Sequence, residues 1–542
     1  MTGPIERKQA ARALIVRRLL AMAPRQRAAA MVEEVDGKAL VRSLPAEDVY
    51  ASILDVGLSD AQEIVQLASP KQFRTFIDLA AWQKDRFDPL ELVRWLEAVR
   101  GESDEDYLAA LARLDIELLE LVFIKLSTIH DLESDPDADG PGVTWQTPEG
   151  KLLVEFNVEG QELATLMRLL KDLETHNAFQ VARFLEAVRH ELPSELEEAA
   201  FRLRSARLEE LGFPPLEEAM KLFAWVNPDT VSPQGKGAPA LAPTGGSVDF
   251  VEAAFKHLDA DERENLAAEV RYLVNAALVA EGAEPGDPPS IRRISEHARD
   301  YLNLGLEHLC GGDPEHAVEV VRKDPLRKSF QIGFSLTLKL RREAEHLREE
   351  PGVYSGETIL ALEEETAALK ALLRRRPLRA LRVAGAEPVA FRSKRELAEV
   401  AAVLARVRRQ APAFGVMLGA APEAAVAPFL CSLAELTPQR FLVAALAWGD
   451  LDGVARAAPV PEARLVELCE RWFEGGAVRT TAGERTLAVW GPKLGEHADA
   501  FADMARRALA VVAQELAASY EREGRVSASR VMSIPVEGQL PI

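Results

Sequence analysis

Apolar residues recur at helical spacing through the first part of the chain, in short segments that follow one another closely. Ser43–Leu54 has a proline placed for a helix start, and Ser69–Trp82 opens with serine and proline as cap and first helical residue. Between them, Leu58–Ala68 carries a capping box from Ser59 to Gln62. Each segment is apolar along one stripe and too short to be stable alone. We therefore expect a mainly α fold that begins with a superhelical stack of short helix pairs.

A repeated sequence supports the expectation of stacked units. RWLEAVRGE at Arg94–Glu102 recurs as RFLEAVRHE at Arg183–Glu191, and Arg113 agrees with Arg202 at the same offset. Agreement at a fixed offset beyond the first helix predicts a duplicated helical unit.

A stretch rich in proline and glycine interrupts the helical pattern at residues 227–247. Its sequence, NPDTVSPQGKGAPALAPTGGS, contains almost no large apolar side chains. Such a composition buries too little surface to offset the entropy lost on ordering. We expect a flexible linker here, between a first domain over residues 1–226 and a second, mainly helical domain over residues 248–542.

The second domain contains one segment that partly matches the tetratricopeptide pattern. Tyr301–Val321 has the expected small residues at Gly305 and Ala317, but no neighbouring segment shares its period. A single unit cannot bury its faces as an array. We therefore interpret it as a lone helical hairpin in which Gly305 and Ala317 allow a close approach of the two helices.

Two segments depart from the helical pattern. Val143–Phe156 and Ala477–Trp490 each alternate apolar and polar residues around a turn that contains glycine. This alternation is typical of antiparallel strands, so it predicts one β-hairpin in each domain.

Two resemblances bear on the fold. Leu40–Trp82, with the steps LPAED and ASPKQ, resembles the superhelical cytoplasmic amino-terminal domain of bacterial magnesium transporters and the repeats of the flagellar motor-switch protein. That resemblance implies a helical superhelix and carries no functional residue across. Over most of its length the chain also resembles an uncharacterised bacterial protein family, through LNLGLEHL and DPLRKSFQIGFSLTLKLRREAEHL. The second resemblance implies no activity.

Charge argues against nucleic acid as a partner. The chain has 65 lysines and arginines against 86 aspartates and glutamates, a formal net charge of −21. This field repels polyanions unless basic residues gather on one face. The densest basic stretch, Leu372–Val383, contains no aromatic residue and follows an acidic run. We interpret it as a solvated or internally paired helix end, with an anion-binding patch as the alternative.

A calcium-loop opening is the main candidate for a metal site. Asp135, Asp137 and Asp139 alternate and are followed by Gly140, as in the first half of an EF-hand loop. Position 12, however, is Gln146, which supplies one neutral oxygen instead of a bidentate carboxylate, and the segment beyond it is the expected hairpin. We therefore expect an ordinary acidic loop, with these three aspartates as weak metal candidates only.

Other signs of chemistry are sparse. The chain has no dinucleotide-binding, phosphate-binding, hydrolase or kinase motif and no zinc-type histidine spacing, so no catalytic residue and no cofactor are expected. Three separated cysteines favour a reduced, cytoplasmic compartment, and no apolar stretch is long enough to insert in a membrane. The sequence thus favours a helical scaffold or regulatory module that binds a protein partner. The alternative is an enzyme or a divalent-ion sensor whose site is assembled from residues far apart.

Overall fold

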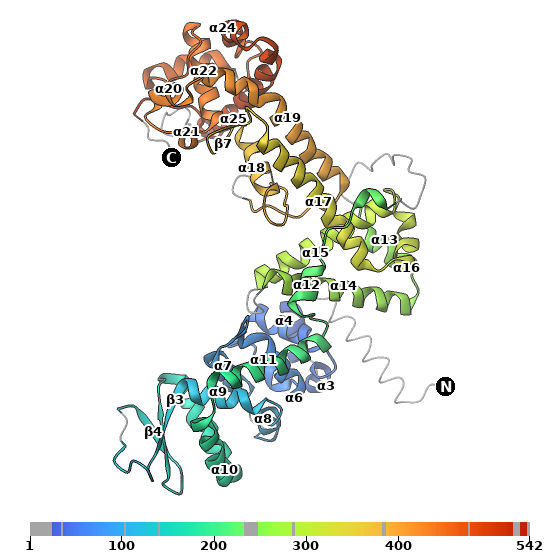
Figure 1. Ribbon diagram of the computed structural model, residues 1–542, viewed down its shortest axis with the longest axis vertical. Helices are drawn as coiled ribbons and strands as arrows, with labels where there is room; N and C mark the ends of the chain where they lie inside the picture. Colours follow the sequence, from blue (N-terminus) through green and yellow to red (C-terminus); the bar gives the residue numbers. More distant parts are fainter. Residues whose placement is uncertain are drawn as a thin grey trace. The chain divides into compact units, whose positions relative to one another are not determined.

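Helices make up most of the chain, as the apolar periodicity predicted. The computed structural model describes residues 24–33, 36–101, 104–138, 141–231, 248–283, 288–381, 386–474, 477–523 and 532–538 (Figure 1). The chain divides into two compact units. Unit 1 comprises Met1–Leu222 and Ala268–Ser295, and unit 2 comprises Phe223–Ala267 and Glu296–Ile542.

Unit 1 consists of helices around a core, with two small sheets. Its helices include α2 (Pro24–Glu33), α3 (Gly37–Val41), α4 (Ala46–Val56), α5 (Gln62–Leu67), α6 (Pro70–Ala80), α7 (Pro89–Val99), α8 (Asp104–Leu111), α9 (Ile116–Leu126), α10 (Gly160–His190), α11 (Pro193–Glu210), α12 (Leu216–Lys221), and parts of α14 (Ala260–Glu281) and α15 (Pro288–Leu309). Its strands include β1 (Trp82–Gln83), β2 (Arg86–Phe87), β3 (Ser127–Asp131), β4 (Val143–Gln146) and β5 (Leu152–Phe156).

The predicted short helices are present, and their apolar stripes meet in one core. The rings of Tyr50 from α4 and Phe76 from α6 lie 5.8 Å and 5.6 Å from that of Trp95 on α7. Buried aromatic rings contribute most per side chain to such a core. The capping box between Ser69 and Gln72 opens α6 as expected, whereas α5 begins at Gln62 without a side-chain cap, so the cap predicted at Ser59 is wrong. The superhelical arrangement of these helices stays a prediction.

A buried ion-pair group fixes α11 against the short helices. Arg207 donates to both Asp78 on α6 and Asp115 at the start of α9, at 2.7 Å and 2.6 Å. Burial raises the pKa of Asp78 from its usual value, and Arg207 opposes that rise. Because both carboxylates share one guanidinium, the group positions three helices together.

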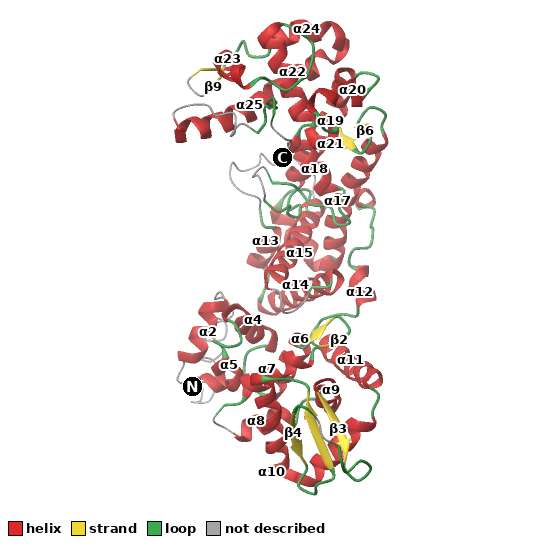
Figure 2. Ribbon diagram, turned by 90° about the vertical axis from the view of Figure 1, so that its left-hand side faces the viewer, coloured by secondary structure: helices red, strands yellow, loops and turns green. Residues whose placement is uncertain are grey.

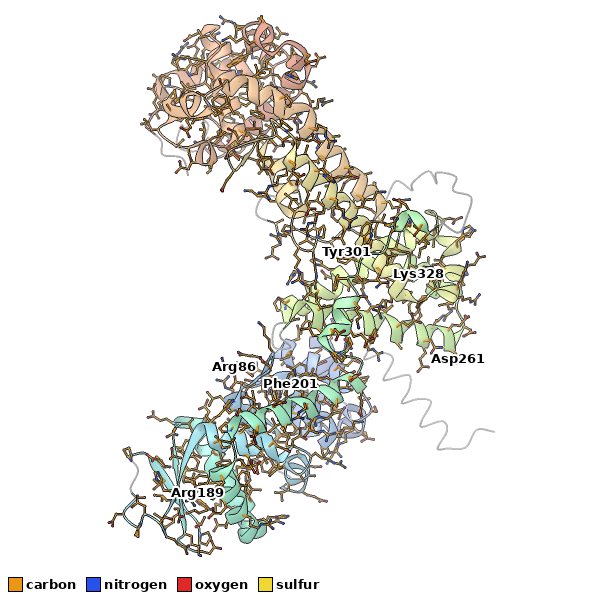
Figure 3. The ribbon with its side chains drawn as sticks, viewed as in Figure 1. Arg86, Arg189, Phe201, Asp261, Tyr301 and Lys328 are labelled. Carbon is orange, nitrogen blue, oxygen red and sulfur yellow. The ribbon has the colours of Figure 1, made fainter. Side chains whose placement is uncertain are left out.

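The first predicted hairpin is confirmed, and a third strand extends it. β4 pairs antiparallel with β5, and β3, which continues directly from α9, pairs with the other edge of β5 (Figure 2). Leu152, Val154 and Phe156 are buried on one face of β5, which gives the alternation seen in the sequence. Arg189 on α10, labelled in Figure 3, lies 3.1 Å from the Asp131 carboxylate at the end of β3.

Unit 2 is also mainly helical. Its elements include η1 (Pro228–Thr230), α13 (Phe250–His257), η2 (Pro314–His316), α16 (Ala317–Lys323), α17 (Leu326–Glu349), β6 (Tyr354–Ser355), β7 (Thr358–Ile359), α18 (Glu363–Leu372), α19 (Lys394–Leu418), α20 (Pro422–Val426), η3 (Ala427–Phe429), α21 (Leu433–Leu436), α22 (Pro438–Asp452), η4 (Glu462–Arg464), α23 (Leu465–Trp472), β8 (Phe473–Glu474), β9 (Ala477–Val478), α24 (Glu484–Leu494), η5 (Gly495–His497) and α25 (Ala498–Glu523).

The close helix crossing in unit 2 differs from the predicted one. A Cβ atom on Gly305 of α15 would lie 1.7 Å from the Ser329 carbonyl oxygen of α17, and one on Gly333 would lie 1.9 Å from the Tyr301 carbonyl oxygen. The two glycines therefore face each other where α15 crosses α17. Gly305 was expected to allow a close approach of the helix that contains Ala317. It allows the close approach of α17 instead.

The second predicted hairpin, over Ala477–Trp490, is wrong beyond its first two residues. Strand β9 pairs with β8, which precedes it, and Glu484–Leu494 is helical. The apolar residues Trp490 and Leu494 are buried at helical spacing with Thr486. Asp450, at the end of α22, accepts hydrogen bonds from the backbone N–H groups of Gly483 and Thr486 and so caps this helix from outside. The cap comes from a distant residue, which local alternation cannot reveal.

The linker expected over residues 227–247 lies mostly outside the described residues. Its described beginning contains η1, where the Asn227 side chain accepts from the Asp229 N–H. The division into domains at this linker stays a prediction.

Candidate functional site

Backbone strain gathers around one very short helix of unit 2. Among the described residues, three that are not glycine have positive φ, namely Lys84, Leu430 and Thr437. The last two lie on either side of α21. We call residues 430–437 the anchor turn. Strained residues persist only where their surroundings hold them, and they are concentrated at functional sites.

Leu430 combines a strained backbone with an exposed side chain. Its φ of 56° and ψ of 31° place it in the left-handed region at the end of η3, where its N–H donates to the Ala427 carbonyl. Its side chain is 94% exposed, more than any other large apolar side chain in the described part of the chain. A leucine in this conformation costs about 1 kcal/mol or more, a cost that glycine would avoid. Because the side chain is exposed, it buries no apolar surface in the isolated chain that could offset this cost.

The residues around Leu430 hold its backbone in place. Phe429, Leu433 and Leu436 are buried in the core of unit 2. Ser432 and Glu435 form a capping box across α21, with the Ser432 N–H 2.7 Å from the Glu435 carboxylate. Hydrogen bonds from the backbone and side chain of Ser432 hold the pKa of Glu435 below its usual value. Leu430 is thus presented by an anchored segment.

Thr437 closes the anchor turn in a conformation that glycine normally adopts. Its φ is 62° and its ψ is 143°. The Thr437 hydroxyl lies 3.2 Å from the Glu363 carboxylate, and the Glu363 N–H donates to the Gln439 side chain at 3.1 Å. These bonds tie the start of α22 to the start of α18. The strain is therefore held in place by contacts from two helices.

A thiol in the anchor turn and an arginine just after it add to its chemistry. Burial, and then Glu435, raise the pKa of the Cys431 thiol, while Arg440 opposes this rise. A thiol with a raised pKa stays protonated and is a poor nucleophile. The buried Nε of Arg440 has no hydrogen-bond partner among the described residues. The Cys431 thiol therefore does not supply a nucleophile at this turn.

The weak metal candidates lie in a loop between two strands. The loop follows β3 and leads into β4, so neither flank is the helix of an EF-hand. Asp135 and Asp137 are exposed there, and Asp139 lies outside the described residues. The carboxylate that organises the loop is Asp131, which accepts from the N–H groups of Glu133 and Ser134. Within the described ranges, no group of three or more carboxylate, histidine or cysteine side chains is placed to hold a metal ion.

The densest basic stretch makes contacts within unit 2. The Arg376 guanidinium lies 4.0 Å from the centre of the Phe223 ring, and burial lowers its pKa to about 10. Arg379 pairs with Glu396 at 2.9 Å. Helix α18 ends at Leu372, the first residue of this stretch. These contacts agree with a partly paired helix end.

The three cysteines are all free and lie in unit 2. Cys310 is buried, and burial raises its pKa to about 12, whereas Cys469 on α23 is half-buried with a pKa raised to about 11 by burial. Both thiols are therefore protonated near neutral pH. Glu315 and His316 are adjacent on the short helix η2.

Sequence reasoning missed the anchor turn. A leucine in the left-handed region has no sequence signature. Glycine or asparagine would have indicated that conformation.

In the described residues, none of the helices combines the length and the apolar character needed to cross a bilayer.

Comparison with known proteins gives one finding. A family model described as a family of unknown function matches residues 4–537. No curated protein and no solved structure matches the chain. The resemblance of residues 40–82 to magnesium transporters gains no support.

Proposed function

Since the chain belongs to DUF6178, a family of unknown function, we propose its function from its physical features: it is a helical protein-interaction module that docks on a partner protein through the anchor turn. The observation that carries this proposal is Leu430, which is 94% exposed on a strained but well-anchored backbone. A backbone that is already held in place loses little entropy on binding. Central apolar anchors of this kind supply much of the affinity of protein interfaces.

The partner would have an apolar pocket that accepts the Leu430 side chain. Glu435 lies in the anchor turn and Arg440 three residues beyond it, and the charges of both act on the Cys431 thiol next to Leu430. Charged groups at an interface rim favour orientation and specificity more than affinity. The cytoplasm is the proposed location, which the three free, widely separated cysteines support.

The test replaces Leu430 in two ways. A photo-crosslinking amino acid at position 430 first identifies the partner in native cytosol, with the same amino acid at Val466, a 60% exposed residue on α23, as the control. Binding of the purified partner is then measured for Leu430→Asp, Leu430→Gly and Val466→Asp. We expect both Leu430 variants to weaken binding at least about tenfold, the loss for a central anchor. Val466→Asp should bind like wild type.

Leu430→Gly separates binding from folding. Glycine adopts positive φ freely, so the free energy of unfolding should be unchanged or raised by up to about 1 kcal/mol. A variant that is at least as stable and yet fails to bind supports the anchor. Equal crosslinking at positions 430 and 466, or wild-type affinity in both Leu430 variants, would refute the proposal.

A further inference from the structure

The 532–538 segment packs into the core of unit 2. Its residues 533–536 are buried in succession. Ile534 is 0% exposed and Val536 is 4% exposed, and both belong to the same apolar core as Val460. Other parts of unit 2 therefore enclose this short stretch of chain.

Val460, which lies between α22 and η4, pairs with the segment through its backbone. It forms an isolated parallel bridge with Val536. In this bridge the Val460 N–H donates to the Pro535 carbonyl at 2.8 Å, and the Val460 carbonyl accepts from the Glu537 N–H at 3.1 Å. Proline has no N–H, so the pairing does not continue past Pro535. The segment is therefore joined to Val460 by a short pairing rather than by a long ladder.

Glu515 on α25 binds the other end of the segment. The Ser533 N–H and hydroxyl donate to its carboxylate at 3.0 Å and 2.7 Å. Hydrogen bonds to a charged acceptor are about twice as strong as those between neutral groups. A second carboxylate at position 533 would instead be repelled by Glu515. We call Val460 and Glu515 the acceptor site of the 532–538 segment.

The acceptor site requires an occupant. Val460 is 0% exposed, so departure of the segment would leave its N–H and carbonyl without these partners inside the core. Buried backbone groups that lose their partners destabilise a fold. Replacement of the segment by another with the same backbone and side-chain groups is therefore more favourable than its release. The same segment of a second copy meets this requirement by identity.

The connection from α25 is long enough for such a replacement. Helix α25 ends at Glu523, and eight residues, 524–531, precede the segment. A connection of that length spans at most roughly 26–29 Å. An exchange between two copies keeps the bonds to Val460 and Glu515 and changes only the path of this connection. Exchange of an identical element in this way is a low-cost route to a dimer.

We propose that two copies of this chain associate by exchanging the 532–538 segment, so that the segment of each copy occupies the acceptor site of the other. The observation that points to exchange is the buried backbone of Val460, both of whose polar groups bond to the segment. The anchor turn takes no part in this association. The proposal therefore goes beyond the proposed function and stands or falls separately from it.

Two variants of the full chain test the exchange. Ser533→Asp places a carboxylate against Glu515, and Glu515→Lys removes the acceptor of Ser533, so each variant should bind its own segment about tenfold more weakly or worse. In a mixture, exchange restores both contacts. The introduced carboxylate meets the introduced lysine, and the unchanged serine meets the unchanged glutamate. Light scattering should show a species of twice the mass in the mixture and the single mass for each variant alone.

Controls separate exchange from folding. The double variant Ser533→Asp/Glu515→Lys restores the contact within one chain, so it should unfold at the wild-type temperature, whereas each single variant should unfold at a lower one. Glu496→Lys changes an exposed carboxylate on η5, and its mixture with Ser533→Asp should keep the single mass. Two wild-type chains with different tags, refolded together at high concentration, should co-purify, and two Ser533→Asp chains should not.

Two outcomes would overturn the proposal. If the mixture keeps the single mass while the double variant regains wild-type stability, the segment serves only its own chain. If both single variants unfold at the wild-type temperature, the contact with Glu515 does not hold the segment. Neither outcome would affect the binding of a partner at Leu430, which is measured separately.

Discussion

Asp300 on α15 has an unusual charge environment. Burial raises its pKa to about 7, Arg392 opposes that rise, and Glu396 and Glu296 add to it. Arg392 lies 3.9 Å from Asp300 but 3.1 Å from Asp249, so its charge is shared between two carboxylates. The folded protein therefore holds a proton on Asp300 that the unfolded chain releases in the same pH range.

This proton makes stability depend on pH in a defined direction. Because the folded pKa is raised, the contribution of Asp300 to stability falls as pH rises from about 4 to about 7. Asp300→Asn should match wild type at about pH 4 and exceed it by roughly 2 kcal/mol at about pH 8, less than the full pKa difference implies because solvent reaches part of the side chain. Urea unfolding at both pH values measures this difference.

The control is Glu343→Gln, which removes an exposed carboxylate from α17. It should change the free energy of unfolding little at either pH. If Asp300→Asn were equally stable relative to wild type at both pH values, the raised pKa would be wrong.

At the scale of elements, the crossing of α15 and α17 depends on the absence of two side chains. Gly305→Ala places a methyl group against the Ser329 carbonyl, so the helices must separate. We expect a loss of about 3 kcal/mol in the free energy of unfolding. The matched control is Gly415→Ala in α19, where a Cβ would meet nothing within 4 Å and helix propensity should stabilise the protein by up to about 1 kcal/mol. Thermal or urea unfolding of both variants provides the measurement. Equal stability of the two would contradict the close crossing.

Elements with local signals were predictable from the sequence. The Ser69 cap and the hairpin over residues 143–156 follow from the serine–proline pair and from alternation within a few residues. Contacts between residues far apart in the chain were not predictable from the sequence. Helix α24 depends on a cap from Asp450, and Gly305 meets a glycine on another helix.

At the scale of the whole molecule, each unit consists of two separate stretches of chain. Residues 268–295 belong to unit 1, although they follow the expected linker. Within that unit, the Tyr272 hydroxyl lies 3.0 Å from the Glu218 carboxylate, and Arg292 lies 3.7 Å from Asp55. A cut in the linker therefore leaves part of unit 1 on the second fragment.

Cleavage in the linker tests this organisation. A protease site inserted within residues 232–247 should be cut without separating the fragments, because unit 1 needs residues from both. Size-exclusion chromatography after cleavage should show one species, and denaturant should be required to separate it. Two folded fragments that elute apart would instead support independent domains over residues 1–226 and 248–542.

The interleaving of the two units also constrains how such a protein is inherited. A gene segment that ends in the linker encodes neither unit completely, because residues 223–267 and 268–295 alternate between them. Recombination at that point would give a partner gene an incomplete core. The family model accordingly spans residues 4–537 as one match. The two units would therefore be exchanged and inherited together, as a single evolutionary module.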